Sequence, residues 1–137
     1  MMMVSSKGRY ALRVMLDLAQ RDNRQYTPLK EIAQAEQISQ KYLESIMTTL
    51  SKAGLVDALH GKGGGYRLNR PVEDYTVGSI LQLTESSMAP VSCLEGEHND
   101  CQHAADCKTL PMWTELNRIV FDYLNSVTIA DLNPAGK

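Results

Sequence analysis

Residues 27–68 read TPLKEIAQAEQISQKYLESIMTTLSKAGLVDALHGKGGGYRL, and this stretch decides the fold. Thr27-Pro28 supplies an N-cap and a first-turn proline for a short helix that ends near Glu36. A second helix starts at the cap Ser39 and stops at Gly54. Two short helices joined by a tight turn predict a helix-turn-helix. The apolar stripe of the second helix consists of Leu43, Ile46, Met47 and Leu50.

The next segment predicts a β-hairpin. Residues 55–60 form one strand, residues 61–65 a flexible glycine-rich tip, and residues 66–68 the returning strand. An α-helix fits the major groove of DNA, and a glycine-rich hairpin can lie against the backbone or in the adjacent minor groove. The helix-turn-helix with its wing therefore favours double-stranded DNA as the partner. Because short helices with a hairpin also occur in protein-interaction domains, that class stays as an alternative.

Candidate DNA contacts cluster at the start of the second helix. Glu44 is informative, because phosphates repel a carboxylate and it is useful there only as an acceptor for an amino group such as that of cytosine. The alternative is that Glu44 merely solvates an exposed face. Basic side chains nearby predict phosphate contacts. The helix contributes Ser39, Gln40, Lys41, Tyr42, Glu44 and Ser45, and the expected phosphate clamps are Lys7, Arg9, Lys62 and Arg67.

Charge is divided unequally along the chain. Residues 1–70 contain eleven Lys/Arg and six Asp/Glu, whereas residues 71–137 contain three and ten. The basic half is also the half that holds the helix-turn-helix and the wing. This division suggests that the first half binds a polyanion and that the second half has a different function.

Further helices flank the central stretch. Ser5 or Ser6 caps a first helix, and Thr76 caps another after the hairpin. Residues 86–108 then predict a long loop, and a loop of this length in a small domain is usually functional or disordered. The apolar positions are Tyr10, Ala11, Val14, Met15, Leu18 and Ala19 in the first helix, and Val77, Ile80, Leu81 and Leu83 in the later one.

A long amphipathic helix starts at Pro111, and residues 128–132 predict a final short turn. A lone long helix needs something to pack against, and its apolar stripe is too long for a chain of 137 residues to cover alone. The sequence therefore predicts a homodimer paired through this helix. The stripe consists of Trp113, Leu116, Val120, Tyr123, Leu124 and Val127.

The long loop contains the three cysteines of the chain, Cys93, Cys101 and Cys107. Thiolates at such intervals on a loop can converge on one centre, and three soft ligands suit an iron–sulfur cluster or zinc. Zinc fingers favour closely paired cysteines, which this loop lacks, so a cluster is the preferred hypothesis. The alternatives are three reduced thiols or a dithiol switch. Interspersed candidate ligands are His98, Asp100, His103 and Asp106.

Several functional classes lack support in the sequence. No nucleophile motif, phosphate loop or convergent acidic pair stands out, so we expect no enzyme activity. No apolar run approaches the ~18 residues that a membrane span needs, and residues 1–6 lack the features of a signal peptide. We therefore expect a cytoplasmic protein with no membrane partner.

At this point the chain resembles the IscR-type winged-helix regulators. The resemblance rests on residues 6–11, 39–44, 54–56 and 61–66, the three cysteines and Trp113. It implies a homodimer in which the long helix pairs two chains and the cysteine loop carries the sensor. It also implies that Ser39, Gln40, Lys41, Tyr42 and Glu44 lie on the recognition helix, that His60, Gly61, Lys62 and Gly63 form the wing, and that Cys93, Cys101 and Cys107 bind the cluster.

This sequence departs from the family pattern at three places. The wing has His60 where the iron–sulfur regulator of the family has arginine. The interval from Cys93 to Cys101 is longer than in that protein and nearer to that of its iron-responsive relatives. Leu110 stands where that protein has the histidine that serves as its fourth ligand. These departures concern the cluster type and the regulated genes.

Together these features predict a mainly α fold with a small β-hairpin. We expect a winged helix-turn-helix DNA-binding domain over residues 1–85, a sensor loop over 86–108, and a dimerisation helix with a tail over 109–137. The expected function is sequence-specific transcriptional regulation, as a repressor, modulated by a two-iron or four-iron cluster. The alternatives are a cluster-free regulator that senses thiol oxidation or a protein partner and, in another class, an iron–sulfur carrier or a protein-interaction module. A carrier has no use for a basic recognition helix and wing.

Overall fold

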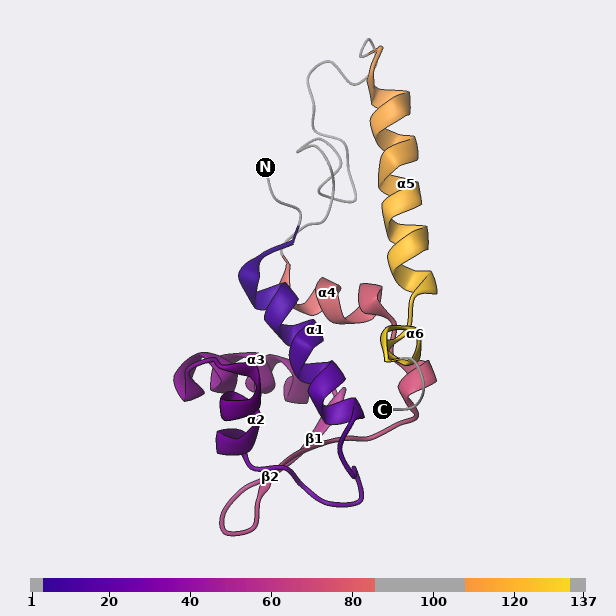
Figure 1. The fold of residues 1–137 in the computed structure, drawn as a ribbon. Helices are drawn as coiled ribbons and strands as arrows, with labels where there is room; N and C mark the ends of the chain where they lie inside the picture. The colour runs from indigo at the N-terminus through magenta and orange to yellow at the C-terminus, as the bar shows by residue number, and fades with distance from the viewer. Residues whose placement is uncertain (1–3, 86–107, 134–137) are drawn as a thin grey trace.

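Helices make up most of the fold, and a single two-stranded hairpin joins them in the described part of the chain (Figure 1). The computed structural model describes residues 4–85 and 108–133. The predicted fold class, mainly α with a β-hairpin wing, is confirmed. The elements are α1 (Ser6–Ala19), α2 (Leu29–Glu36), α3 (Gln40–Lys52), β1 (Val56–Leu59), β2 (Gly65–Leu68), the 3-10 helix η1 (Val72–Asp74), α4 (Val77–Thr84), α5 (Leu110–Ser126) and α6 (Ile129–Leu132).

Three helices begin at the caps that the sequence predicts. Ser5 caps α1 by accepting a hydrogen bond from Gly8 N at 3.1 Å, and Ser39 caps α3 by accepting one from Tyr42 N at 3.1 Å. Thr76 caps α4 in the same way. Each cap satisfies a backbone N–H that the first helical turn leaves without a partner. Leu83, predicted on the buried stripe of α4, is instead exposed.

The predicted cap of α2 is wrong. The N-cap position is Pro28, and Thr27 lies in extended backbone that pairs with Tyr66 in β2. Thr27 N donates to Tyr66 O at 2.8 Å, and Tyr66 N donates back to Thr27 O at 2.9 Å. Because a Cβ atom at Gly65 would collide with Thr27 O, only glycine fits where β2 begins, and Gly65 belongs to this strand rather than to the tip.

The core joins elements from both ends of the chain. Apolar side chains of α1, α2 and α3 meet there with Tyr75 and with Ile129 of α6. Ile129 has no exposed surface, and its backbone N–H donates to Tyr75 O at 2.9 Å. The chain therefore returns to the body after α5. Other fully buried members of this core are Ala11, Val14, Met15, Leu18, Ile32, Leu43, Ile46, Met47, Leu50 and Ile80.

Helix α5 rises away from the body, and only its C-terminal part lies beside α4 (Figure 1). Phe121 and Leu124 of that part, and Val127 directly after the helix, pack on Val77 and Leu81 of α4. The predicted apolar stripe is therefore partly wrong, because Leu124 and Val127 pack within the protomer. The large apolar side chains left exposed on α5 are Met112, Leu116, Ile119 and Tyr123. Within the described residues, no helix has the length and apolar character needed to cross a membrane.

Candidate nucleic-acid interface

One side of α3 is left uncovered by the rest of the body. The helix packs inward through the apolar stripe that the sequence predicts. Three of the predicted DNA contacts, Gln40, Lys41 and Glu44, share the uncovered side and are exposed. A shallow hollow of about 500 Å³ lies over this surface, and it is lined by Lys41, Glu44, Ser45, Thr48 and Thr49.

Tyr42 lies differently from the expectation that the whole start of α3 is exposed. It is half-buried, and its ring meets that of Tyr10 in α1 edge-on, with centroids 5.8 Å apart. An edge-to-face aromatic pair stabilises the packing of two helices beyond the area that it buries. Ser39 is exposed, but its hydroxyl is engaged as the helix cap. Both predicted contacts are thus also part of the framework that holds α3.

The first turn of α1 lies beside α3 and adds positive charge. Lys7 Nζ donates to Thr49 Oγ1 at 3.2 Å, so this ammonium group lies at the edge of the uncovered side of α3. Arg9 is exposed, and its guanidinium donates to Ser6 Oγ at 3.2 Å. A guanidinium bonded to a neutral hydroxyl keeps its net charge, as a phosphate contact requires. Both predicted phosphate clamps of α1 are therefore available to an anion next to α3.

The wing places His60, Gly61, Lys62 and Gly63 together on one exposed turn. Gly64 N donates to Gly61 O at 3.0 Å and closes this turn. Gly61 and Gly63 adopt φ angles of 92° and 78°, in the left-handed region that favours glycine. The tip, for which flexibility is predicted, forms a turn in this structure, with Lys62 between two glycines that the backbone requires.

Glu44 connects the recognition surface of α3 with the wing. Burial raises the pKa of Tyr66 in β2, and the nearby negative charge of Glu44 raises it further. The carboxylate therefore lies near the strand that leads back from the wing tip. Helix α3 thus neighbours the start of α1, through Lys7 and Thr49, and strand β2 of the wing, through Glu44 and Tyr66.

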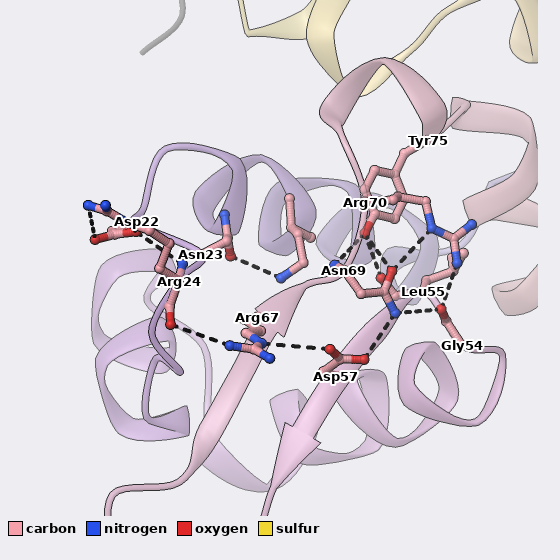
Figure 2. Close-up of polar contacts among 11 residues, drawn as sticks. Asp22, Asn23, Arg24, Gly54, Leu55, Asp57, Arg67, Asn69, Arg70 and Tyr75 are labelled. Atoms are coloured by element: carbon pink, nitrogen blue, oxygen red, sulfur yellow. Dashed lines mark hydrogen bonds and ion pairs between the residues drawn. The ribbon is translucent and has the colours of Figure 1, made fainter.

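The base of the wing is fixed to the C-terminal end of α3 by Asn69 and Tyr75 (Figure 2). The buried Tyr75 hydroxyl accepts from Asn69 N at 3.0 Å and donates to Leu55 O at 2.8 Å. The Asn69 amide donates to Gly54 O at 2.8 Å, and the Arg70 guanidinium donates to the same oxygen at 2.8 Å. These bonds join the residue that follows β2 to the residues that follow α3. They fix the angle between the wing and the recognition helix.

The other edge of the wing is fixed by Arg67 (Figure 2). Its guanidinium lies 4.3 Å from the centre of the Tyr26 ring, donates to Arg24 O at 3.3 Å and pairs with Asp57 at 3.6 Å. The sequence predicts a phosphate clamp at this position. With these three partners inside the protein, Arg67 holds the strand in place, and its phosphate contact stays a prediction.

The predicted cluster ligands Cys93, Cys101 and Cys107 lie outside the described residues. Within residues 4–85 and 108–133, no three His, Cys, Asp or Glu side chains gather into a metal site. Glu85, the last described residue before the cysteines, is tied to the cap of α1: its carboxylate accepts from Ser5 N and from Ser5 Oγ, both at 2.6 Å. Glu85 therefore lies at the start of α1.

Comparison with known proteins identifies the family. The Rrf2 family, described as "Iron-dependent Transcriptional regulator", matches residues 4–134. This chain belongs to the Rrf2 family. The HTH-type transcriptional regulator IscR of Vibrio campbellii is 37% identical to this Rrf2 chain over 131 residues, which are 96% of this chain and 77% of that protein.

Solved structures of Rrf2 relatives have the same fold. CymR, the global cysteine regulator of B. subtilis, superimposes with a TM-score of 0.77 at 34% identity and covers 97% of each chain. The IscR of T. potens gives a TM-score of 0.74 at 33% identity, covering 98% of this chain and 88% of that one. This Rrf2 chain is thus a DNA-binding transcriptional regulator, and its named relatives are regulators rather than enzymes.

Thr48 on the surface of α3, and Asn69 and Tyr75 at the base of the wing, are functional residues outside the predicted set. Thr48 lies one helical turn after Glu44 on the uncovered side, and the four-residue spacing was a signal that could have found it. Asn69 and Tyr75 gave no such signal, because their partners are backbone groups of other elements.

Proposed function

We propose that this protein is a homodimeric repressor that binds a two-part operator sequence-specifically and whose DNA affinity depends on an iron–sulfur cluster held by Cys93, Cys101 and Cys107. The observation that carries the DNA-binding part is the uncovered side of α3, which exposes Glu44 and has Lys7 at its edge, together with the exposed wing turn that contains Lys62. It combines cationic groups for phosphates with one carboxylate for a base edge.

Each protein group has a defined task in this proposal. Lys7, Arg9 and Lys62 neutralise phosphates on both sides of the groove that receives α3. Glu44 accepts a hydrogen bond from a cytosine amino group, and its charge penalises register shifts in which it would face a phosphate. The fixed wing angle keeps Lys62 at a constant distance from α3. A dimer bound in this way covers its operator and blocks access to it, which is the basis for repression.

Dimerisation is proposed from the exposed apolar side chains of α5. Two copies that pack this helix against each other would bury Met112, Leu116, Ile119 and Tyr123, which are 38–65% exposed in the single chain. Isologous pairing of this kind gives two recognition helices related by a two-fold axis and hence a palindromic operator.

The donor set fits an iron–sulfur cluster in its chemistry. Three thiolates are soft ligands of the kind that such clusters use, and the family is described as iron-dependent. When bound, a cluster supplies a centre that changes its charge or composition with redox conditions. Leu110 offers only hydrocarbon, so the fourth ligand has to come from His98, Asp100, His103 or Asp106, from the partner chain or from an exogenous molecule. We expect bound iron to be labile, because an oxygen or exchangeable ligand binds iron less firmly than thiolate.

Purification without oxygen tests the cluster. We expect visible absorption, with bound iron and sulfide, that each of Cys93→Ser, Cys101→Ser and Cys107→Ser removes. DNA affinity for a selected operator should differ between protein with and without the chromophore. Protein without absorption, iron or sulfide after anaerobic reconstitution would contradict the cluster, and a thiol switch or a protein partner would then be the signal.

Selection from a randomised DNA library tests the recognition surface. Lys62→Ala should weaken all sequences alike and lower the slope of log affinity against log salt by close to one unit. Glu44→Ala should mainly relax base preference. If Glu44→Ala keeps the full base preference, this carboxylate does not recognise a base. A library from which no sequence is enriched would favour a carrier or interaction module.

A further inference from the structure

Thr48 occupies the uncovered side of α3 one turn beyond Glu44. Its side chain is exposed and helps to line the same hollow as Lys41, Glu44 and Ser45. A helical turn advances about 5.4 Å, and successive base pairs of DNA are about 3.4 Å apart. A helix lying along the groove therefore brings Thr48 about two base pairs from the one that faces Glu44.

The Thr48 hydroxyl is turned back onto its own helix. Its Oγ1 donates to Glu44 O at 2.8 Å, the bond that helical threonines commonly make to the carbonyl four residues earlier. A hydroxyl has a single proton, so Thr48 has no donor left for a base edge. Because a β-branched side chain is stiff about χ1, the same bond also fixes where the methyl group lies. The group that Thr48 offers to a partner is thus mainly its methyl.

We propose that Thr48 is a specificity-determining residue that reads a thymine through contact between its methyl group and the thymine 5-methyl group. Thymine is the only base with a methyl group in the major groove, and threonine methyl is one of the apolar groups that recognise it. The inference rests on the proposed function, since it needs α3 in the major groove. It adds an apolar, thymine-specific contact to the polar contact of Glu44.

Thr49 provides a matched control within the same helix. It is half-buried, its hydroxyl donates to Ser45 O at 3.2 Å, and Lys7 Nζ donates to it at 3.2 Å. Its hydroxyl therefore lies at the junction of α1 with α3. Both threonines make the same bond to the helix, but only Thr48 is exposed.

The test uses the full-length dimer and an operator selected from a randomised DNA library. Each thymidine of the operator is replaced in turn by deoxyuridine, which removes the 5-methyl group alone. For the unmodified protein, one replacement per half-site, about two base pairs from the Glu44-dependent position, should lower the affinity about fourfold, as expected for one buried methyl group.

Three variants assign the effect to the Thr48 methyl group. In Thr48→Ser, which keeps the hydroxyl, the deoxyuridine replacement should no longer lower the affinity. In Thr48→Val, which keeps the methyl groups, and in Thr49→Ser, the effect should persist. The inference is overturned if Thr48→Ser remains as sensitive to the replacement as the unmodified protein, if Thr48→Val loses the sensitivity, or if no thymidine of an enriched operator is sensitive. Failure to enrich any sequence would instead contradict the proposed function and remove the basis of the inference.

Discussion

The DNA-facing body and α5 differ in how they cover their apolar side chains. In the body, α1, α2 and α3 close a core in which the large side chains have no exposed surface. In α5, none of the 17 residues is buried. A helix with an exposed apolar face is unstable alone in water, whereas the body covers its own apolar side chains. The difference is the basis of the proposal that α5 pairs with a second copy of the chain.

The largest effect is expected from charges on the exposed face of α5. Leu116→Glu with Ile119→Glu should raise the dimer dissociation constant ~1,000-fold or more, because unpaired carboxylates buried in an interface cost several kcal/mol. The molar mass in solution measures this change. Thr114→Glu with Arg118→Gln, on the opposite face, changes the charge equally and should leave the dimer intact. A dimer that survives the first pair would show that another surface holds it.

A smaller effect, on stability, is expected from Ile129 in the core. Ile129, which follows α5, fills the core, so Ile129→Ala should lower the free energy of unfolding by about 3 kcal/mol. Leu132→Ala in the same short helix should cost less than about 1 kcal/mol, because Leu132 is 43% exposed. Urea unfolding of both variants provides the comparison, and equal losses would mean that Ile129 is not the residue that seals the core.

A smaller loss should follow removal of one hydroxyl. Tyr75→Phe leaves Asn69 N and Leu55 O without their partner, and this should cost about 2 kcal/mol in the free energy of unfolding. Tyr123→Phe on α5 should have no measurable effect, because Tyr123 is 65% exposed. If the two variants are equally stable, the network at the base of the wing contributes little.

The smallest effect is expected at Glu85 and depends on pH. Burial pushes the pKa of Glu85 up, but hydrogen bonds from Ser5 and Thr84 outweigh it, so its pKa lies below its ordinary value of 4.5. A lowered folded-state pKa means that the stabilisation is present above pH 4.5 and is lost as the pH falls through the lowered value. Glu85→Gln should therefore lower the free energy of unfolding at pH 7 by about 1 kcal/mol. The variant should also lose less of its free energy of unfolding than the unmodified protein as the pH falls below 4.5.

Glu115 on α5 is the control for Glu85. A hydrogen bond from Arg118 holds the pKa of Glu115 below its usual range, but this pair is fully exposed. Solvent screens such a pair, so Glu115→Gln should leave the stability unchanged at every pH. An equal response of both variants would contradict the distinction between the body and α5.

The sequence predicted those features that depend on local signals. The caps Ser5, Ser39 and Thr76 could be predicted because each bonds a backbone group three residues away. The conformation of Thr27 could not be predicted, because a threonine before a proline suits both a helix cap and extended backbone. It is extended because it pairs with Tyr66, 39 residues later.

The candidate site follows the same rule. The exposed residues of α3 follow from helical periodicity. The contacts of Arg67 depend instead on the Arg24 carbonyl and the Tyr26 ring, and those of Asn69 on the Gly54 carbonyl, all of which lie far away in the sequence. The face of α5 that stays exposed was also missed, because α4 decides which apolar residues it covers.

The closed turn of the wing has a kinetic consequence. Gly64 N bonds to Gly61 O, and Asn69 and Tyr75 hold the base of the wing, so these contacts within the protein restrict the wing without DNA. A preorganised surface loses less conformational entropy on association. The association rate should then be governed by charge and ionic strength, and substitutions in the surface should change mainly the residence time on the operator.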